Sequence, residues 1–205
     1  MAKDADILTS NELDALIISI YLGEIDVYNL PLNLYSQTWD YYAKGLIEGF
    51  GDIITAEQQV LFESLFQNVQ LFSGAKTANQ ILDYQSFLLT EKGIARDFID
   101  FKKLVLAKYE TYNKTWLKTE YEFIVESAKA AKRWTKIQAN KELFDLLEYV
   151  TAGDDRVRPS HKALDGIIRK VDDPFWNKYY PPWEWRCRCT TKSYSSEDVT
   201  VTEWV

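Results

Sequence analysis

The sequence predicts a mainly α protein, with an elongated helical body and a small α+β module at its C-terminal end. From Thr9 to about Val150, apolar residues recur at intervals of three and four, the spacing typical of amphipathic helices. Beyond that point the helical spacing disappears, and Pro, Trp, Arg and Asp become frequent. We therefore expect a helical body over residues 1–150 and a separate C-terminal module over residues 151–205.

The composition limits the classes of protein that the chain can represent. A chain of 205 residues, 46% of them hydrophobic, is long enough to bury a core, and the aromatic share of 15% suits wide protein interfaces as well as cores. The formal net charge of -7 argues against a general nucleic-acid binder, which needs a basic face. No apolar run reaches the length of about 18 residues that could span a bilayer, and the first residues lack the pattern of a secretory signal. We expect synthesis in the cytoplasm and no contact with a membrane.

Capping signals predict where the first two helices begin. Thr9 and Glu12 have the spacing of a capping box, so a helix should start there and run to about Val27. Pro31 is suited to the first position of a second helix, because its missing N–H would have no partner there. The second helix should end at the Gly49-Phe-Gly51 sequence.

The same signals predict two further helices and one long helical tract. A third helix should run from Thr55 through Leu65, and a fourth from about Thr77 to Leu89. The tract that follows, residues 95–137, contains neither Pro nor Gly, and Asn113 is its candidate interruption.

The second half of this tract carries bulky and small residues in alternation at helical spacing, from Trp116 through Tyr121 and Ala128 to Trp134. Such a stripe is typical of a face buried in the protein's own core. It also suits a surface that docks on another subunit, so both interpretations stay open.

The unusual chemistry of the chain is concentrated in its last quarter, which holds the single histidine and both cysteines. Alternation and β-branched residues favour strands over residues 187–194 and 199–205. If residues 185–191 form a strand, Cys187 and Cys189 point to the same face, because side chains alternate along a strand. His161 and Asp165 are four residues apart and share one side of a short helix. A histidine and two cysteines, with Asp165 or water as the fourth ligand, match the donors that zinc prefers.

Other interpretations of these residues compete with a zinc site. His161 can instead hydrogen-bond a loop carbonyl while the two cysteines pack as small apolar side chains. His161 can act as a catalytic base or proton donor, or can activate a cysteine nucleophile, although no residue is identified as the orienting third group.

Several arginines of the same region are interleaved with tryptophans and neighbour many aspartates. This arrangement allows contact with nucleic acid by charge and stacking, but it favours ion pairs within the protein. Asp173 before Pro174 predicts a turn that anchors Phe175 and Trp176 on the helices, and Gly166 should end the short helix that bears His161.

The ordered combination of these residues resembles the phage Mu protein F-like family, which is also called the head morphogenesis family of the phage SPP1 minor head protein. One departure from the pattern is that Trp183 and Glu184 stand where the family often has Asn-Gly, a pair that favours tight turns. The residues that carry the resemblance are Asp154 or Asp155, Arg156, Arg158, His161, Leu164, Gly166, Trp176, Pro181, Pro182, Cys187, Arg188 and Cys189.

The resemblance implies a minor capsid protein of a tailed phage or prophage. Such a protein acts in head assembly at or near the portal and has portal, capsid or scaffold proteins as partners. Some members of the family stay in the virion head near the portal or the DNA. We expect this non-enzymatic role, with a compact and zinc-stapled C-terminal motif. The alternatives are a metal-dependent hydrolase or nuclease built around His161, Asp165, Cys187 and Cys189, and a head protein that contacts DNA through its arginines.

Overall fold

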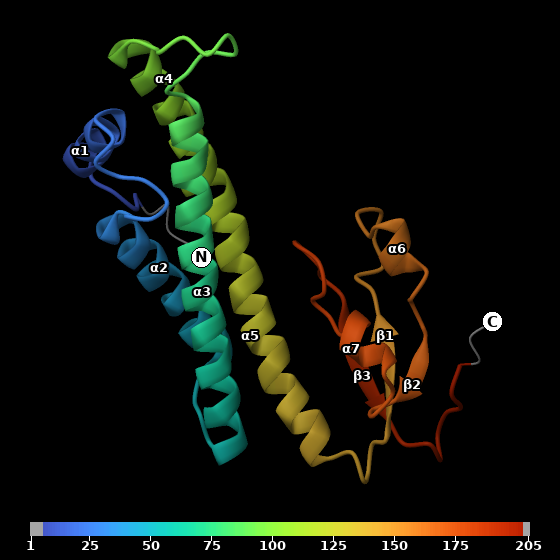
Figure 1. Cartoon of the computed structure of the whole chain (residues 1–205). Coiled ribbons are helices and arrows are strands. Elements are labelled where there is room, and N and C mark those ends of the chain that lie inside the picture. The colour runs from blue at the N-terminus through green and yellow to red at the C-terminus, as the bar shows by residue number, and fades with distance from the viewer. Residues whose placement is uncertain (1–5, 203–205) are drawn as a thin grey trace. The chain divides into compact units, whose positions relative to one another are not determined.

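The structure is a computed structural model that describes residues 6–202, and it confirms a mainly α fold with a small α+β module near the C-terminus (Figure 1). In the described part of the chain, no helix is both long and apolar enough to cross a bilayer. The helices are α1 (Ser10–Tyr21), α2 (Leu32–Phe50), α3 (Ala56–Ser86), α4 (Phe98–Glu110), the π-helix η1 (Thr111–Trp116), α5 (Leu117–Ala139), α6 (Pro159–Lys162) and α7 (Phe175–Tyr179), and the strands are β1 (Leu146–Val150), β2 (Ile168–Lys170) and β3 (Thr190–Tyr194).

The chain divides into two compact units. The first contains the residues up to Glu48 together with Glu63–Glu122, and the second contains Gly49–Phe62 together with the residues from Phe123 onward. The predicted boundary between a helical body ending at residue 150 and a module beginning at residue 151 stays a prediction. In the structure, β1 lies before that point and pairs with two strands that lie after it.

In the first unit, α1 packs against α4. The ring of Tyr21 contacts those of Phe98 and Phe101, with centroids 5.2 and 5.4 Å apart. The hydroxyl of Tyr109 accepts a hydrogen bond from the backbone N–H of Leu8 at 2.9 Å. The predicted capping box is confirmed, because Thr9 and Glu12 exchange hydrogen bonds at the start of α1.

A buried ion pair joins α3 to α5 within the first unit. The ammonium group of Lys76 lies 2.7 Å from a carboxylate oxygen of Glu120, with side chains only 3% and 13% exposed. The same ammonium donates to the backbone carbonyl of Tyr112 in η1 at 3.0 Å, and the hydroxyl of Tyr42 donates to Glu120. Every member of this buried network therefore has a polar partner, as burial requires.

The predicted helix limits need two corrections. The first helix ends at Tyr21 rather than near Val27, and Gly23 follows it with a left-handed φ of 77°. The predicted third and fourth helices form the single helix α3, within which the hydroxyl of Ser73 donates to the carbonyl of Val69 one turn earlier, so this polar residue does not end the helix. The interruption predicted at Asn113 is confirmed, since Asn113 lies inside η1.

The second unit contains a three-stranded antiparallel sheet in the order β2-β1-β3 (Figure 1). Its small core is formed by buried residues of β1 and of the segments between the strands, namely Leu147, Tyr149, Leu164, Val171 and Trp176. The indole N–H of Trp176 donates to the carbonyl of Lys170 at 2.9 Å, and Asp173 accepts from the N–H of Phe175 at 2.8 Å. The turn and apolar anchor predicted for this segment are therefore present.

Three predictions about strands need correction, although the strand expected over residues 187–194 is present in part as β3. Leu146–Val150 was included in the helical body but forms the central strand β1. Residues 185–189 form a turn and an irregular segment, because Arg186 adopts a left-handed φ of 60° that a strand does not accommodate. Residues 199–202 form no strand, although Thr202 exchanges hydrogen bonds with the backbone of Ile168; residues 203–205 of the predicted strand lie outside the described residues.

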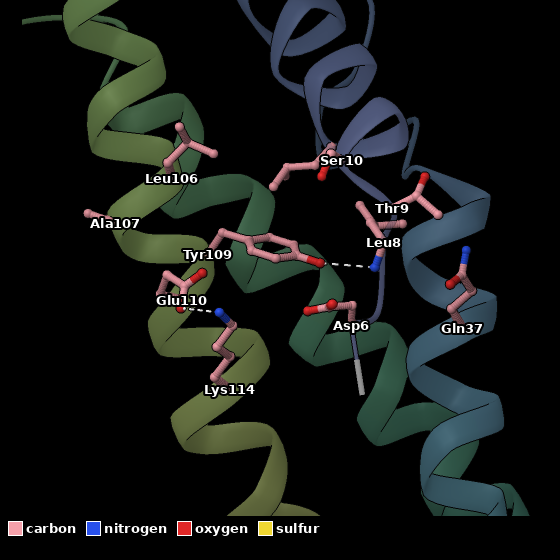
Figure 2. A pocket seen from close by; sticks show the side chains of 11 residues that line it. Asp6, Leu8, Thr9, Ser10, Gln37, Leu106, Ala107, Tyr109, Glu110 and Lys114 are labelled. Atoms are coloured by element: carbon pink, nitrogen blue, oxygen red, sulfur yellow. Dashed lines mark hydrogen bonds and ion pairs between the residues drawn. The ribbon is translucent and has the colours of Figure 1, made fainter. Parts of the chain in front are cut away.

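The first unit also has an open groove beside the segment that leads into α1 (Figure 2). Leu8 and Thr9 form one side of it, and Leu106 and Tyr109 of α4 form another. Glu110 and Lys114 pair with each other at 2.8 Å in this groove. Its lining mixes apolar, acidic and basic side chains without a concentration of any one kind.

Candidate metal centre

His161 lies in the second unit, on the single helical turn α6. Pro159 occupies the first position of this helix, and the side chain of His161 is buried, with the residue only 2% exposed. The following turn ends at Gly166, which has a left-handed φ of 76° and donates its N–H to the carbonyl of Tyr149 at 2.8 Å. This bond ties the turn that carries His161 to the central strand β1.

A tight turn brings the two cysteines to the same imidazole. The N–H of Cys187 donates to the carbonyl of Glu184, and Arg186 takes the left-handed conformation between them. The Nδ1 atom of His161 lies 3.6 Å from the sulfur of Cys187 and 3.4 Å from the sulfur of Cys189. The three ligand atoms all lie within 4.8 Å of one another, and both cysteines are free thiols.

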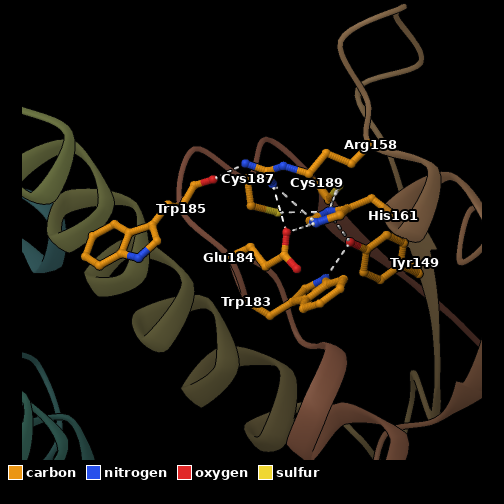
Figure 3. A network of polar contacts seen from close by, with 8 residues as sticks. All are labelled: Tyr149, Arg158, His161, Trp183, Glu184, Trp185, Cys187 and Cys189. Atoms are coloured by element: carbon orange, nitrogen blue, oxygen red, sulfur yellow. Dashed lines mark hydrogen bonds and ion pairs between the residues drawn. The ribbon is translucent and has the colours of Figure 1, made fainter.

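A tyrosine and a tryptophan complete the surroundings of Nδ1 (Figure 3). The hydroxyl oxygen of Tyr149 lies 3.3 Å from Nδ1 of His161 and accepts a hydrogen bond from the indole N–H of Trp183 at 2.9 Å. The indole also stacks on the imidazole, with ring centroids 4.3 Å apart and planes inclined by 15°. Trp183 therefore holds both the imidazole ring and the phenol.

The other imidazole nitrogen faces a carboxylate. Nε2 of His161 lies 3.1 Å from an oxygen of Glu184, and the guanidinium of Arg158 lies 3.1 Å from the same oxygen. A second nitrogen of Arg158 donates to the carbonyl of Trp185 at 2.6 Å, which fixes the guanidinium in place. A carboxylate at Nε2 favours the tautomer that carries its proton there and leaves the lone pair of Nδ1 directed at the sulfurs.

These distances fit a tetrahedral zinc ion. With Zn–N of about 2.0–2.1 Å and Zn–S of about 2.3 Å, nitrogen and sulfur ligands at tetrahedral angles are separated by about 3.6 Å. The two distances from Nδ1 of His161, 3.6 and 3.4 Å, agree with that value. One nitrogen and two sulfurs are donors that zinc prefers, so His161, Cys187 and Cys189 can hold the ion.

Burial also affects the ionisation of the site. The pKa of the Cys189 thiol is raised to about 11, chiefly by burial; a hydrogen bond from Tyr149 opposes this shift and the neighbouring Cys187 adds to it. Burial is likewise the main cause that raises the pKa of the Tyr149 hydroxyl. A bound divalent cation would favour the deprotonated forms of such groups.

Around this centre, the arginines of the motif pair with carboxylates. Arg188 forms two hydrogen bonds of 2.7 Å with the two carboxylate oxygens of Asp154, and the pKa of Asp154 is lowered chiefly by this contact. Arg156 lies 3.4 Å from the same carboxylate. Asp154 is therefore the motif aspartate that pairs with Arg188, and the predicted internal ion pairing is confirmed for these arginines.

The predicted ligands are only partly brought together. His161, Cys187 and Cys189 form the cluster, but the carboxylate of Asp165 accepts a hydrogen bond from the backbone N–H of Thr151 at 2.7 Å and is not part of it. Of the other motif residues, Pro181 is buried and is joined to Pro182 by a cis peptide bond.

The sequence analysis did not identify three residues of the centre. Tyr149 was assigned to a helix, although the alternation of Leu147, Glu148 and Tyr149 was a signal for a strand. Trp183 and Glu184 were noted as a departure from the family pattern, and Trp183 also as one of the tryptophans among the arginines, but neither was assigned to the site. In the structure these two residues hold the His161 ring from its face and from Nε2.

Comparison with known proteins shows which family the chain is similar to. The family model described as Phage Mu protein F like protein matches residues 90–192, half of the chain and the whole of the cluster. The chain is 34% identical over 80 residues to the F protein of Escherichia phage Mu, whose name ascribes it to capsid assembly, and 39% identical over 69 residues to the Mu-like prophage FluMu F protein of Haemophilus influenzae. These alignments cover 39% and 34% of this chain.

A third relative, an uncharacterised protein of Methanocaldococcus jannaschii, is 25% identical over 183 residues, or 89% of this chain. The alignments cover 18%, 17% and 25% of the three relatives, so the chain spans a quarter or less of their length. No solved structure matches the chain. The chain belongs to the Phage Mu protein F like family, as the match over half of its length shows.

Proposed function

We propose that this chain acts as a minor head protein in the assembly of a tailed-phage or prophage head, at or near the portal. Membership of the Mu F-like family supports this role, and the phage Mu relative is named for capsid assembly. In this proposal the protein is made in the host cytoplasm, becomes part of the virion head, and contacts portal, capsid or scaffold proteins through its helical unit.

The second part of the proposal is that zinc staples the C-terminal module. Bound zinc would supply a cross-link of fixed geometry, joining His161 of α6 to two cysteines that follow it by 26 and 28 residues. The buried cluster of Nδ1 and two sulfurs is the observation that carries this proposal. A structural zinc site contributes directly to folding stability, so the staple would fix the module during assembly.

The enclosure of the cluster supports a structural site over a hydrolase or nuclease. A catalytic zinc needs an open position for water or substrate. Here His161 and Cys187 are only 2% and 8% exposed, and the phenol of Tyr149 lies against Nδ1. Three of the arginines that could have contacted DNA, Arg156, Arg158 and Arg188, pair with carboxylates instead, which supports an assembly role over DNA binding.

Metal analysis of variants tests the staple. The chain purified under reducing conditions should contain one zinc ion, and His161→Ala and Cys187→Ser should each lose the metal and melt at a lower temperature. Ser160→Ala changes an exposed neighbour of His161 and serves as the control, which should keep both metal and stability. Absence of zinc in the unaltered protein after incubation with zinc salt would overturn the staple, as would its retention in both variants.

Head assembly is tested separately through an exposed aromatic residue. Tyr28 is 96% exposed in the first unit, so replacing it should leave the fold intact. If the helical unit docks on head proteins through such residues, Tyr28→Ser should reduce the yield of complete heads in a complementation assay, whereas Tyr28→Phe should preserve it. Normal heads with Tyr28→Ser would exclude Tyr28 from docking, and normal heads in the absence of the protein would overturn the assembly role.

A further inference from the structure

We propose that Tyr149 is the fourth zinc ligand, binding through its phenolate oxygen. This inference rests on the zinc site proposed above and replaces the Asp165 carboxylate expected from the sequence. The four ligand atoms would be Nδ1 of His161, the sulfurs of Cys187 and Cys189, and the hydroxyl oxygen of Tyr149.

The phenol oxygen of Tyr149 lies at the distance from His161 that is expected of a zinc ligand. Zinc ligands of nitrogen and oxygen at tetrahedral angles, with bonds of about 2.0–2.1 Å, are separated by about 3.4 Å. The oxygen of Tyr149 lies 3.3 Å from Nδ1 of His161. It is also hydrogen-bonded to the thiol of Cys189, so it contacts the cluster at two of its three ligand atoms.

The hydrogen bonds of this oxygen leave room for a metal bond. The indole N–H of Trp183 can only donate, so the 2.9 Å bond occupies a lone pair of the Tyr149 oxygen. When the phenol loses its proton to solvent as the Zn–O bond forms, another lone pair becomes available to the metal. The indole then donates to an anionic oxygen, and such charge-assisted hydrogen bonds are stronger than neutral ones.

The backbone holds Tyr149 rigidly at this position. The residue is fully buried on the central strand β1, where it is paired with Thr191 of β3. Its N–H donates to the carbonyl of Ile167, and its carbonyl accepts from Gly166, each at 2.8 Å. The phenol is thus fixed before the metal arrives, which lowers the entropic cost of binding.

The neighbouring carboxylates are occupied elsewhere. Asp165 accepts from the backbone N–H of Thr151 at 2.7 Å, and Glu184 lies at Nε2 of His161, on the opposite edge of the ring from the sulfurs. Glu184 therefore orients the imidazole without reaching the metal, as outer carboxylates of zinc-bound histidines do. With Tyr149 in the fourth position the site would be closed to water, as in structural zinc sites.

Zinc titration of the metal-free protein under reducing conditions tests this assignment. Binding should produce the near-ultraviolet difference band of tyrosinate, which saturates at one zinc ion per chain. Tyr149→Phe should abolish the band, release one proton fewer per zinc ion and weaken binding by roughly tenfold or more, since loss of even an outer partner typically costs that much. Tyr180→Phe is the matched control, because that hydroxyl donates to the carbonyl of Ala130, away from the cluster.

The outcomes separate this inference from the proposed function. Zinc binding by the unaltered protein without a tyrosinate band would overturn Tyr149 as a ligand and leave the zinc staple in place. Failure of the unaltered protein to bind zinc would overturn both. The band is read in the unaltered protein, so the test does not depend on whether Tyr149→Phe folds.

Discussion

The buried ion pair of the first unit gives the most demanding prediction about stability. Replacing Glu120 by Ala removes the carboxylate that faces Lys76, whose side chain is only 3% exposed. The ammonium group would keep the carbonyl of Tyr112 at 3.0 Å as its partner but would lose its counter-charge. The hydroxyl of Tyr42 would also lose its acceptor.

The expected loss follows from these contacts. Removing one member of a buried ion pair typically costs about 3–5 kcal/mol, because the other charge is left uncompensated. At a denaturant dependence of about 2–3 kcal/mol per molar urea, the midpoint of unfolding should fall by roughly 1–2 M. Burial already lowers the pKa of Lys76, and Glu120 opposes this effect. Without Glu120 the ammonium can deprotonate more easily, so the loss of stability should shrink as the pH rises toward the ordinary lysine pKa of 10.5.

Urea unfolding followed by circular dichroism measures this loss. Glu126→Ala is the control on the same helix, since Glu126 forms an exposed pair with Lys129 and should change the free energy of unfolding by less than about 1 kcal/mol. The double variant Lys76→Met with Glu120→Leu removes both charges and should be more stable than Glu120→Ala. Equal midpoints for Glu120→Ala and Glu126→Ala would refute the argument.

Two further predictions concern glycines and alkaline pH. Gly49→Ala would place a Cβ atom 2.3 Å from the carbonyl oxygen of Val125 and should destabilise the protein. In Gly74→Ala the new Cβ atom has no neighbour closer than 3.8 Å, so this substitution should stabilise α3 by roughly 0.5–1 kcal/mol. Thermal melting distinguishes the two variants, and equal melting temperatures would contradict the close packing at Gly49. Burial raises the pKa of Tyr109 to about 12, so its contribution to stability should be complete below about pH 10 and be lost as the pH rises through 12. Unfolding at increasing pH should show a shallower loss in Tyr109→Phe, and parallel curves would exclude this contribution.

Features fixed by neighbouring residues could be predicted from the sequence. The capping box of Thr9 and Glu12 involves residues three apart, and the interruption at Asn113 lies within a single helical tract. The continuity of α3 could not be predicted, because the polar residues Ser73 and Thr77 look like a helix boundary but bond within the helix.

The sequence predicted the nitrogen and sulfur ligands of the candidate site, but it did not predict the residues that hold those ligands in place. His161, Cys187 and Cys189 were identified by residue type, and the structure brings them together although the predicted strand is absent. The three side chains come together because Arg186 adopts a left-handed backbone conformation, and no local sequence pattern predicts that conformation for an arginine. Tyr149 reaches the cluster from a strand whose partners begin at residues 168 and 190, so its role depends on tertiary pairing.

X-ray absorption at the zinc edge tests the central claim of a closed zinc site most directly. The zinc-loaded chain should show two sulfur neighbours at about 2.3 Å and two nitrogen or oxygen neighbours at about 2.0–2.1 Å. A shell of five or six nitrogen and oxygen atoms without sulfur would contradict the account, because it would place the ion away from Cys187 and Cys189.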